Sequence, residues 1–380
     1  MPHLRKVIVA IDSFKGSISS EEAGKCVADS IRKINPSCHV EVIAIGDGGE
    51  GSGRIITKAH NGTLITTRAH DSLMRPCSGL YGQLDGGRAV VELADTCGLA
   101  LLNLDERNPR TTSSYGCGEV IREAIEAGNK EILLCLGGSA TNDGGMGILH
   151  ALGYRFLDHK GDELPPCGDS LILVRDIKDD HVIPSLREVR FLLLNDVVNC
   201  FYGKKGAAYV YAPQKGATMQ EVVLLDEGLQ NYARVLMSHS GVDVQRISGS
   251  GAAGGVAGGC IGLLRADVVS GIEYVLNATG FFSLLEDCDL VITGEGRIDQ
   301  QSFMGKVLQK IVDHSSSKDI PVLAFAGQVA DDFHAQDYGL LGAYGIHPQG
   351  FPHKLSMQKE HTMTHLSQCV VRVLRELELC

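Results

Sequence analysis

A glycine-rich stretch directly behind a buried strand constrains this chain more than any other feature. Residues 136–147 read L-G-G-S-A-T-N-D-G-G-M-G and follow the branched apolar run 132–136, which predicts a strand. The apolar residues of 146–152 have helical spacing, and Gly153 could end that helix. Strand, glycine-rich loop and helix can bring backbone N–H groups and a helix N-terminus together around an anion. The alternative is a tight connection that needs glycine only for its turn.

Polar side chains within this loop favour a binding role over a plain turn. Ser139, Thr141 and Asn142 supply hydroxyl and amide donors, whereas Asp143 suits a cation or a substrate hydroxyl. The residues of the loop that we expect to bind a ligand are Gly137, Gly138, Ser139, Thr141, Asn142, Asp143 and Gly144.

Composition narrows the class of protein. A chain of 380 residues usually forms two domains, and 44% hydrophobic with 21% charged residues is typical of a globular protein. The net charge of −11 argues against nucleic-acid or anionic-membrane partners, so local cations would have to meet an anionic substrate. Twelve cysteines show no C-x-x-C pair, and we find no signal peptide and no apolar run of about 20 residues. These features predict a cytoplasmic protein with reduced thiols.

Strands and helices alternate along the first part of the chain. Strand 7–11 precedes a helix capped by Ser19 or Ser20, and strand 39–45 precedes a helix through Ile55. A third strand is expected at 63–68. This order predicts βαβ units and a parallel sheet, with ligands beyond the carboxyl ends of its strands.

The pattern changes at Arg75-Pro76 and returns near Asp289. Residues 77–93 predict a hairpin around Asp85-Gly86-Gly87, and 209–211 resemble a short strand. The last part of the chain carries two strand-like runs and an amphipathic helix at 364–379, too few strands for a separate sheet. We therefore predict an α/β fold with a parallel sheet shared by both chain ends and the middle of the chain inserted.

Acidic and cationic residues fall where these strands end. Asp12, Ser13 and Lys15 could hold an anion, although a lone lysine is often only solvated. Asp47 and Glu50, within a glycine-rich turn, could reach a metal ion or a hydroxyl.

Three further groups complete the set. Asp196 follows strand 189–194 and could equally form an Asx turn. Lys215 is expected to be an exposed lysine beside a glycine that would let a ligand approach. Glu295, Arg297, Asp299 and Lys306 suit a magnesium–phosphate complex, with a charged surface loop as the alternative.

Some motifs point less clearly to function. Residues 249–254 match G-x-G-x-x-G and Glu273 follows, but the only preceding strand candidate, 242–247, alternates with polar residues. Close packing is the better interpretation of these glycines. No Walker A loop is present, because Gly305-Lys306 is followed by valine. His361 and His365 could bind a metal, but without a third ligand they indicate a solvated face.

The motifs taken together resemble the bacterial type I glycerate kinase family. The matching stretches are D-S-F-K-G-S (12–17), D-G-G-E-G (47–51), R-N-P-R-T-T-S-S-Y-G-C-G-E (107–119), G-G-S-A-T-N-D-G-G (137–145), P-Q-K-G-A (213–217), G-A-A-G-G (251–255) and I-T-G-E-G-R-I-D (292–299). Departures occur at Gly46, Ser52, 92–99 and 195–201, and the resemblance fades past Gln328.

The resemblance implies transfer of the ATP γ-phosphoryl group to D-glycerate with Mg²⁺, giving 2-phosphoglycerate. It implies two α/β domains, 1–75 with 283–380 and 76–282, with the active site in the cleft between them. A NAD-dependent hydroxyacid dehydrogenase using 249–254 and a non-catalytic sensor of small acids remain alternatives. The sequence does not indicate an oligomeric state.

The residues receive roles on this hypothesis. Lys15 or Arg297 would hold the glycerate carboxylate, with Asp12, Ser13 and Glu50 also in the substrate site. Asp196, or else Asp47, would accept the hydroxyl proton. Glu295 and Asp299 would bind Mg²⁺, and residues 139–145 with Lys215 and Lys306 would bind ATP.

Overall fold

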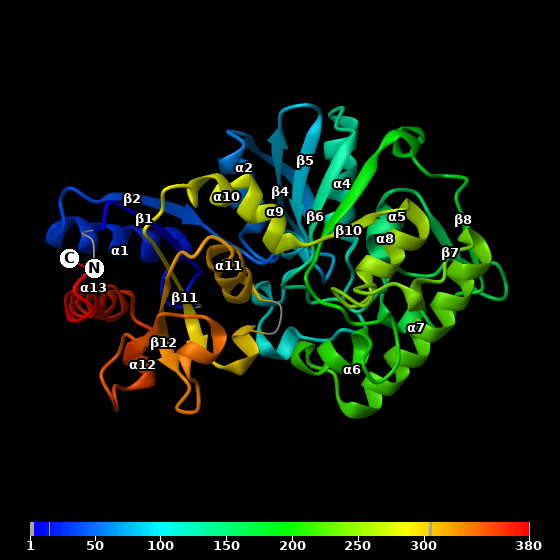
Figure 1. Cartoon of the computed structure of the whole chain (residues 1–380). Coiled ribbons are helices and arrows are strands. Elements are labelled where there is room, and N and C mark those ends of the chain that lie inside the picture. The colour runs from blue at the N-terminus through cyan, green and yellow to red at the C-terminus, as the bar shows by residue number, and fades with distance from the viewer. Residues whose placement is uncertain (1–3, 15, 304–305, 380) are drawn as a thin grey trace. The chain divides into compact units, whose positions relative to one another are not determined.

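A computed structural model describes residues 4–14, 16–303 and 306–379 (Figure 1). Lys15, predicted to hold the substrate carboxylate, therefore lies outside the described residues. The chain divides into two compact units. We call Met1–Gly46 with Val275–Cys380 the terminal unit, and Asp47–Tyr274 the central unit.

The terminal unit is built on a five-stranded sheet in the order β13-β12-β11-β1-β2, with every neighbouring pair parallel. Val7 pairs with Leu290, so the two ends of the chain share one sheet as predicted. Its strands and helices are β1 (Lys6–Ile11), α1 (Ser20–Ile34), β2 (His39–Ala44), α10 (Phe281–Leu284), β11 (Leu290–Ile298), α11 (Val307–Ser316), β12 (Val322–Val329), β13 (Gly342–Gly345), α12 (His353–Ser356) and α13 (Lys359–Glu376).

Local sequence explains these elements. Ser19 caps α1 through a reciprocal capping box with Glu22. β1 is buried from Val7 to Ile11, as a central parallel strand should be. α13 packs beside α1 (Figure 1) and buries the apolar stripe predicted for 364–379, although it begins five residues earlier.

The central unit contains a mixed six-stranded sheet in the order β10-β9-β6-β5-β4-β3, in which β10, β9, β6 and β5 are parallel. The predicted hairpin is confirmed as antiparallel β4–β5, and β7 and β8 form a separate pair. Its strands and helices are α2 (Ser52–Ala59), β3 (Thr63–His70), β4 (Pro76–Leu84), β5 (Arg88–Glu92), α3 (Ala94–Cys97), α4 (Tyr115–Glu126), β6 (Glu131–Cys135), α5 (Met146–Ala151), β7 (Arg155–Leu157), β8 (Asp176–Lys178), β9 (Arg190–Leu194), α6 (Ala207–Tyr211), α7 (Met219–Ser240), α8 (Val256–Leu264) and β10 (Asp267–Val269), with α9 (Gly271–Ala278) at its end.

Two expectations about local structure were wrong. The strand at 63–68 does not extend the first parallel sheet, because β3 pairs antiparallel with β4 in the central unit. The first compact segment of the terminal unit ends at Gly46, and the predicted domain boundary at 75 stays a prediction. Residues 209–211 end helix α6, whose Ala207 and Ala208 are buried, so packing overrides the strand preference of Tyr and Val. Residues 244–246 form a 3₁₀ turn, in keeping with the doubt about the strand candidate at 242–247.

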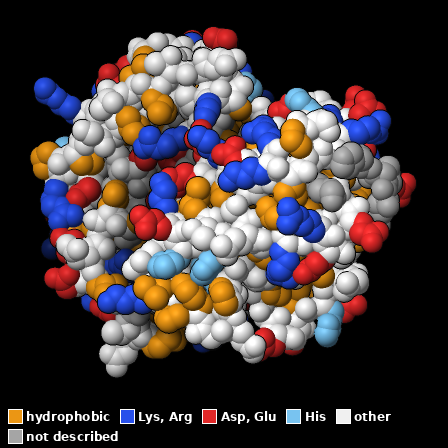
Figure 2. Space-filling model, turned by 90° about the vertical axis from the view of Figure 1, so that its left-hand side faces the viewer, with side chains coloured by type: hydrophobic (Ala, Val, Ile, Leu, Met, Phe, Trp, Pro, Cys, Tyr) orange, Lys and Arg blue, Asp and Glu red, His pale blue; other side chains and the backbone are white. Residues whose placement is uncertain are grey.

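No helix of the described ranges is long and apolar enough to cross a membrane. Figure 2 shows lysine and arginine side chains interspersed with aspartate and glutamate on the face that it presents. This mixture on that face fits the expectation that cations act locally and not through a broad basic field.

We predict that Leu366→Ala destabilises the terminal unit by about 2–5 kcal/mol, because Leu366 is fully buried on α13. Urea unfolding followed by circular dichroism measures the change. Gln368→Ala, at an exposed position of the same helix, should shift the transition by no more than about 0.5 kcal/mol. Equal effects of the two substitutions would contradict the packing described for α13.

Candidate functional site

The glycine-rich loop leaves the carboxyl end of β6 and packs against the loop that carries Asp47 and Glu50. A Cβ atom on Gly137 would lie 2.4 Å from the Cα of Gly49, so only glycine permits this approach. The Glu50 carboxylate lies over Gly138, with its Oε2 3.9 Å from where a Cβ would be. Two of the predicted motifs are therefore neighbours within the central unit.

The Asp143 carboxylate occupies the N-terminus of α5, where we expected a bound anion. Its carboxylate is fully buried and accepts hydrogen bonds from the Gly145 N–H (3.1 Å) and the Gly147 N–H (3.1 Å). Ser114 adds its N–H and its hydroxyl, both at 2.7 Å. Burial raises the pKa of Asp143, and these hydrogen bonds oppose the shift. The helix N-terminus is thus satisfied by the chain itself.

Lys215 reaches the same loop from the other side. Its Nζ donates to Ser139 Oγ (2.8 Å) and to the backbone oxygen of Thr141 (2.6 Å). Only 2% of the lysine is exposed, although the sequence suggested an exposed side chain. Burial lowers the pKa of Lys215 to about 7, while the nearby Asp143 carboxylate opposes this shift.

The G-x-G-x-x-G stretch covers this loop. A Cβ on Gly254 would lie 2.0 Å from the Thr141 oxygen, and the Gly144 N–H donates to the Gly254 oxygen at 3.1 Å. Close packing, as the sequence suggested, explains these glycines. Beneath them the Thr141 hydroxyl and both amide atoms of Asn142 are buried without a protein partner, so they require water or ligand groups.

Two further carboxylates hold helix N-termini beside this loop. Glu92, at the end of β5, accepts from the Gly51 N–H (2.7 Å) and the Arg54 N–H (3.0 Å) in the first turn of α2. Burial raises its pKa. Asp196, beyond β9, accepts from Ser270 Oγ (2.6 Å) and the Ile272 N–H (2.9 Å) at the start of α9. Asp196 therefore has a capping role, and the catalytic role predicted for it stays a prediction.

In the terminal unit the strand order reverses between β1 and β11, because β2 lies on one side of this pair and β12 and β13 on the other. Ligands bind at such switch points in parallel sheets. Asp12 follows β1, and its carboxylate accepts from the Ser13 N–H at 2.6 Å. Glu295 and Arg297 lie in the last part of β11.

Glu295 has an unusual environment. Burial raises the pKa of its carboxyl group, and the negative charges of Asp12 and Asp299 act in the same direction. Its Oε1 is buried without a hydrogen-bond partner. A hydrogen bond with Ser302 and the charge of Lys306 oppose the shift. Lys306 is the N-cap residue of α11, although its side chain makes no capping hydrogen bond, and exposed Arg297 pairs with Asp299 at 3.3 Å. This arrangement suits a cation shared by carboxylates.

A model of the Glycerate kinase family matches residues 7–378. The chain belongs to this family. The glycerate kinase of Bacillus subtilis (strain 168) is 36% identical over 98% of the chain and 96% of its own length. The glycerate 2-kinase of Escherichia coli (strain K12) is 37% identical over 90% and 88%. A crystal structure from Salmonella typhimurium LT2, assigned as a glycerate kinase 2, has a TM-score of 0.84 and 32% identity over 99% of both chains.

Membership of the glycerate kinase family disagrees with the dehydrogenase alternative, and the structure agrees with the family. Residues 244–246, ahead of Gly249, form a 3₁₀ turn, whereas a dinucleotide fingerprint requires a strand there. The glycines of 249–255 are used in covering the loop behind β6.

Sequence reasoning missed several residues of this kinase-family site. Ser114 lies in a matched motif and Glu92 begins the stretch 92–99 that departs from the family pattern. Neither received a role, because a hydrogen bond to a distant loop leaves no spacing signal. Thr112, whose hydroxyl donates to the Ala140 oxygen at 3.0 Å, was missed for the same reason. Asp95, where the sequence departs from the family pattern, pairs with Arg54 at 3.4 Å.

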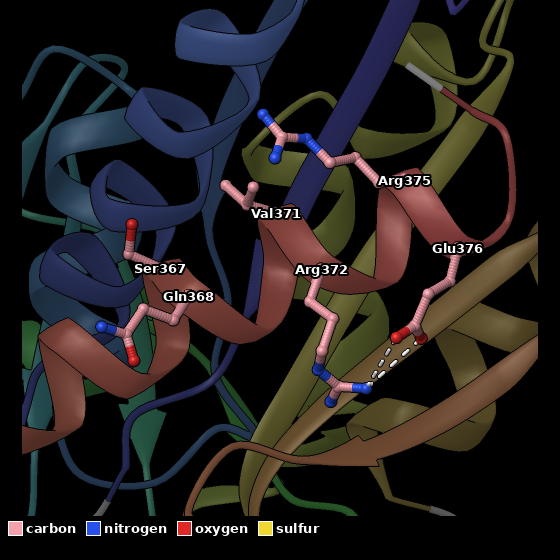
Figure 3. A pocket seen from close by; sticks show the side chains of 6 residues that line it. All are labelled: Ser367, Gln368, Val371, Arg372, Arg375 and Glu376. Atoms are coloured by element: carbon pink, nitrogen blue, oxygen red, sulfur yellow. Dashed lines mark hydrogen bonds and ion pairs between the residues drawn. The ribbon is translucent and has the colours of Figure 1, made fainter.

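Two surface features lie apart from these residues. A hollow beside α13 is lined by Ser367, Gln368, Val371, Arg372, Arg375 and Glu376, and within it Arg372 pairs with Glu376 at 3.3 Å (Figure 3). None of the predicted site residues lines it. His365 faces His347, with their Nδ1 atoms 2.9 Å apart, and Phe351 packs against His361 and His365. The pair predicted as a solvated face is thus partly packed.

We predict that Lys215 makes stability rise with pH above about 7. Its folded pKa is lowered to about 7, whereas an unfolded lysine titrates near 10.4. Between these values the unfolded chain binds more protons, so the free energy of unfolding should gain up to about 1.4 kcal/mol per pH unit from this group. Urea titrations from pH 7 to 9 measure the slope.

Lys215→Met should remove this contribution to the slope, and Lys160→Met, at an exposed position of the same unit, should keep it. The same slope in both variants would show that Lys215 is protonated in the folded protein throughout this range.

Proposed function

We propose that this chain transfers the γ-phosphoryl group of ATP to the 2-hydroxyl of D-glycerate, giving 2-phospho-D-glycerate and ADP. The observation that carries the proposal is the family match over residues 7–378, together with relatives named glycerate kinase and glycerate 2-kinase. The site residues support it, because acids and cations lie at the carboxyl ends of strands in both units. The location of the active site in a cleft between two domains stays a prediction, as does a cytoplasmic location.

Catalysis of this reaction depends on positioning and on charge. The phosphoryl group needs cations around its oxygens, for which Lys306 is our first choice among the described residues. The glycerate carboxylate needs another, for which Lys15 and Arg297 remain the predicted groups. Arg297 would exchange its exposed pairing with Asp299 for the substrate.

We propose that Glu295, with Asp299, holds Mg²⁺ on ATP. The partnerless Oε1 of Glu295 and the acidic neighbours that raise its pKa fit a divalent cation. Within 4–14, 16–303 and 306–379, no three His, Cys, Asp or Glu side chains are placed to hold a metal by themselves. Mg²⁺ commonly uses one or two carboxylates and completes its shell with phosphates and water, so such a preformed group is not required. When bound, it would neutralise charge on the phosphoryl oxygens.

The proposal predicts ADP release from Mg·ATP with D-glycerate and little release with L-glycerate, tartronate or no acid. A coupled assay measures ADP, and ³¹P NMR distinguishes the 2-phosphate from the 3-phosphate. Release without an acid, or none with any acid, would contradict glycerate kinase activity. Binding of D-glycerate without turnover would favour the non-catalytic alternative, and a 3-phosphate product would overturn only the position of transfer.

For the metal, we predict that Glu295→Gln raises the Mg²⁺ concentration for half-maximal activity by tenfold or more, on the order seen when metal-site groups are lost. The amide keeps the shape of the side chain but removes its charge. Glu286→Gln, at an exposed position of the terminal unit, is the control and should leave the requirement unchanged. An unchanged requirement in Glu295→Gln would assign Mg²⁺ to other residues.

A further inference from the structure

The hydroxyl that attacks ATP must lose its proton, and the central unit holds a pair of side chains suited to accept it. We propose that this proton leaves through Ser139 Oγ to Lys215 Nζ. Ser139 would contact the substrate hydroxyl, and Lys215 would be a positioning residue that acts through Ser139. The inference rests on the proposed glycerate kinase function and names its proton acceptor.

The geometry is that of a hydroxyl paired with a buried amine. Lys215 Nζ lies 2.8 Å from Ser139 Oγ, within the reach of direct proton transfer. Both residues are buried, with 2% of the lysine and 6% of the serine exposed, so the pair is shielded from bulk solvent. Ser139 follows the two glycines at the carboxyl end of β6, with the Glu50 carboxylate over Gly138. Substrates of parallel sheets bind at this end of the strands.

Further contacts orient the pair. Thr141 supplies a backbone oxygen at 2.6 Å from Nζ. A neutral amine that donates one N–H there can turn its lone pair toward the Ser139 hydroxyl, which then becomes the donor. Ala140, which lies between Ser139 and Thr141, is fixed at both of its backbone polar groups. Its N–H donates to the Cys97 oxygen at 2.8 Å, and its oxygen accepts from the Thr112 hydroxyl. The pair is therefore held before any substrate binds.

The surroundings keep the amine available as a base. A buried lysine favours its neutral form, because the charged ammonium loses its hydration. The Asp143 carboxylate opposes this effect and raises the pKa of Lys215. Asp143 is itself held by hydrogen bonds from Ser114 and from the N-terminus of α5. A base that titrates near the working pH is efficient in proton transfer.

The two aspartates predicted as bases are less well placed. Asp196 accepts hydrogen bonds from Ser270 and from the N-terminus of α9, and the exposed side chain of Asp47 accepts from the Gly49 N–H at 3.0 Å. Both carboxylates therefore accept hydrogen bonds from groups of their own unit.

The step balances without another reactant. The substrate oxygen forms a bond to the γ-phosphorus while the bond from that phosphorus to the β–γ bridging oxygen breaks, and the electron pair of that bond leaves with ADP. The hydroxyl proton passes to Ser139 Oγ as the serine proton passes to the lone pair of Lys215. Lys215 ends as an ammonium ion and returns the proton to solvent after the products leave.

The test is steady-state kinetics of the full chain with Mg·ATP and D-glycerate from pH 5.5 to 9. The variants are Ser139→Ala, Lys215→Met and the double variant, with Lys160→Met as an exposed-lysine control. Each single variant should lose about 100-fold in kcat, with KM for ATP changed by no more than about twofold. The double variant should lose no more than the worse single variant, because the two groups act as a unit.

The pH profile separates this role from a structural one. In the unmodified protein kcat/KM should rise with pH through about 7, as the neutral amine forms, and this limb should be absent in Lys215→Met. Independent losses in the double variant, a limb that persists in Lys215→Met, or a rise in KM for ATP with kcat unchanged would overturn the proposal. If the variants do not fold, a flat profile of the unmodified protein near pH 7 overturns it. An unmodified protein without turnover overturns the proposed function as well.

Discussion

The buried carboxylate of Asp143 is the interaction on which the central site depends. A fully enclosed charge is costly unless hydrogen bonds surround it, and here the four donors come from Ser114, Gly145 and Gly147. These bonds join the motif at 107–119 to the glycine-rich loop. The same carboxylate lies near the buried amine of Lys215 and partly opposes the lowering of its pKa by burial. The separate motifs of the sequence thus meet around two buried ionisable side chains.

The acidic side chains of the two units differ in whether hydrogen bonds satisfy their carboxylates. In the central unit Asp143, Glu92 and Asp196 are turned inward and satisfy N–H groups at the starts of helices. In the terminal unit Glu295 has a carboxylate oxygen without a partner, and acidic neighbours raise its pKa. On our proposal, a chain of net charge −11 meets an anionic substrate through a few lysines and arginines, with a metal ion held by acids of the terminal unit.

Hydrophobic periodicity and turn residues were enough to predict most strands and helices of the parallel sheets. They also predicted that one sheet is built from both ends of the chain. They failed for β3, because a strand pattern does not name its partner, and for α6, because a five-residue run of Ala, Tyr and Val reads equally as strand. Loop glycines and acids marked the candidate site. The contacts of these residues could not be predicted from the sequence, because the burial of Lys215 and the capping by Asp196 depend on residues more than seventy positions away.

The pairing of β1 with β11 has a consequence for biosynthesis. β1 is buried among partners only when residues near the other end of the chain have left the ribosome, because Val7 pairs with Leu290. At about 5–20 residues per second the delay is roughly 15–60 s. The central unit can become compact during this interval, whereas the apolar strand Lys6–Ile11 waits with one of its two neighbours missing. The nascent chain therefore carries an apolar, aggregation-prone amino-terminal segment. Chaperone binding and the rate of translation are thus relevant to the yield of folded protein.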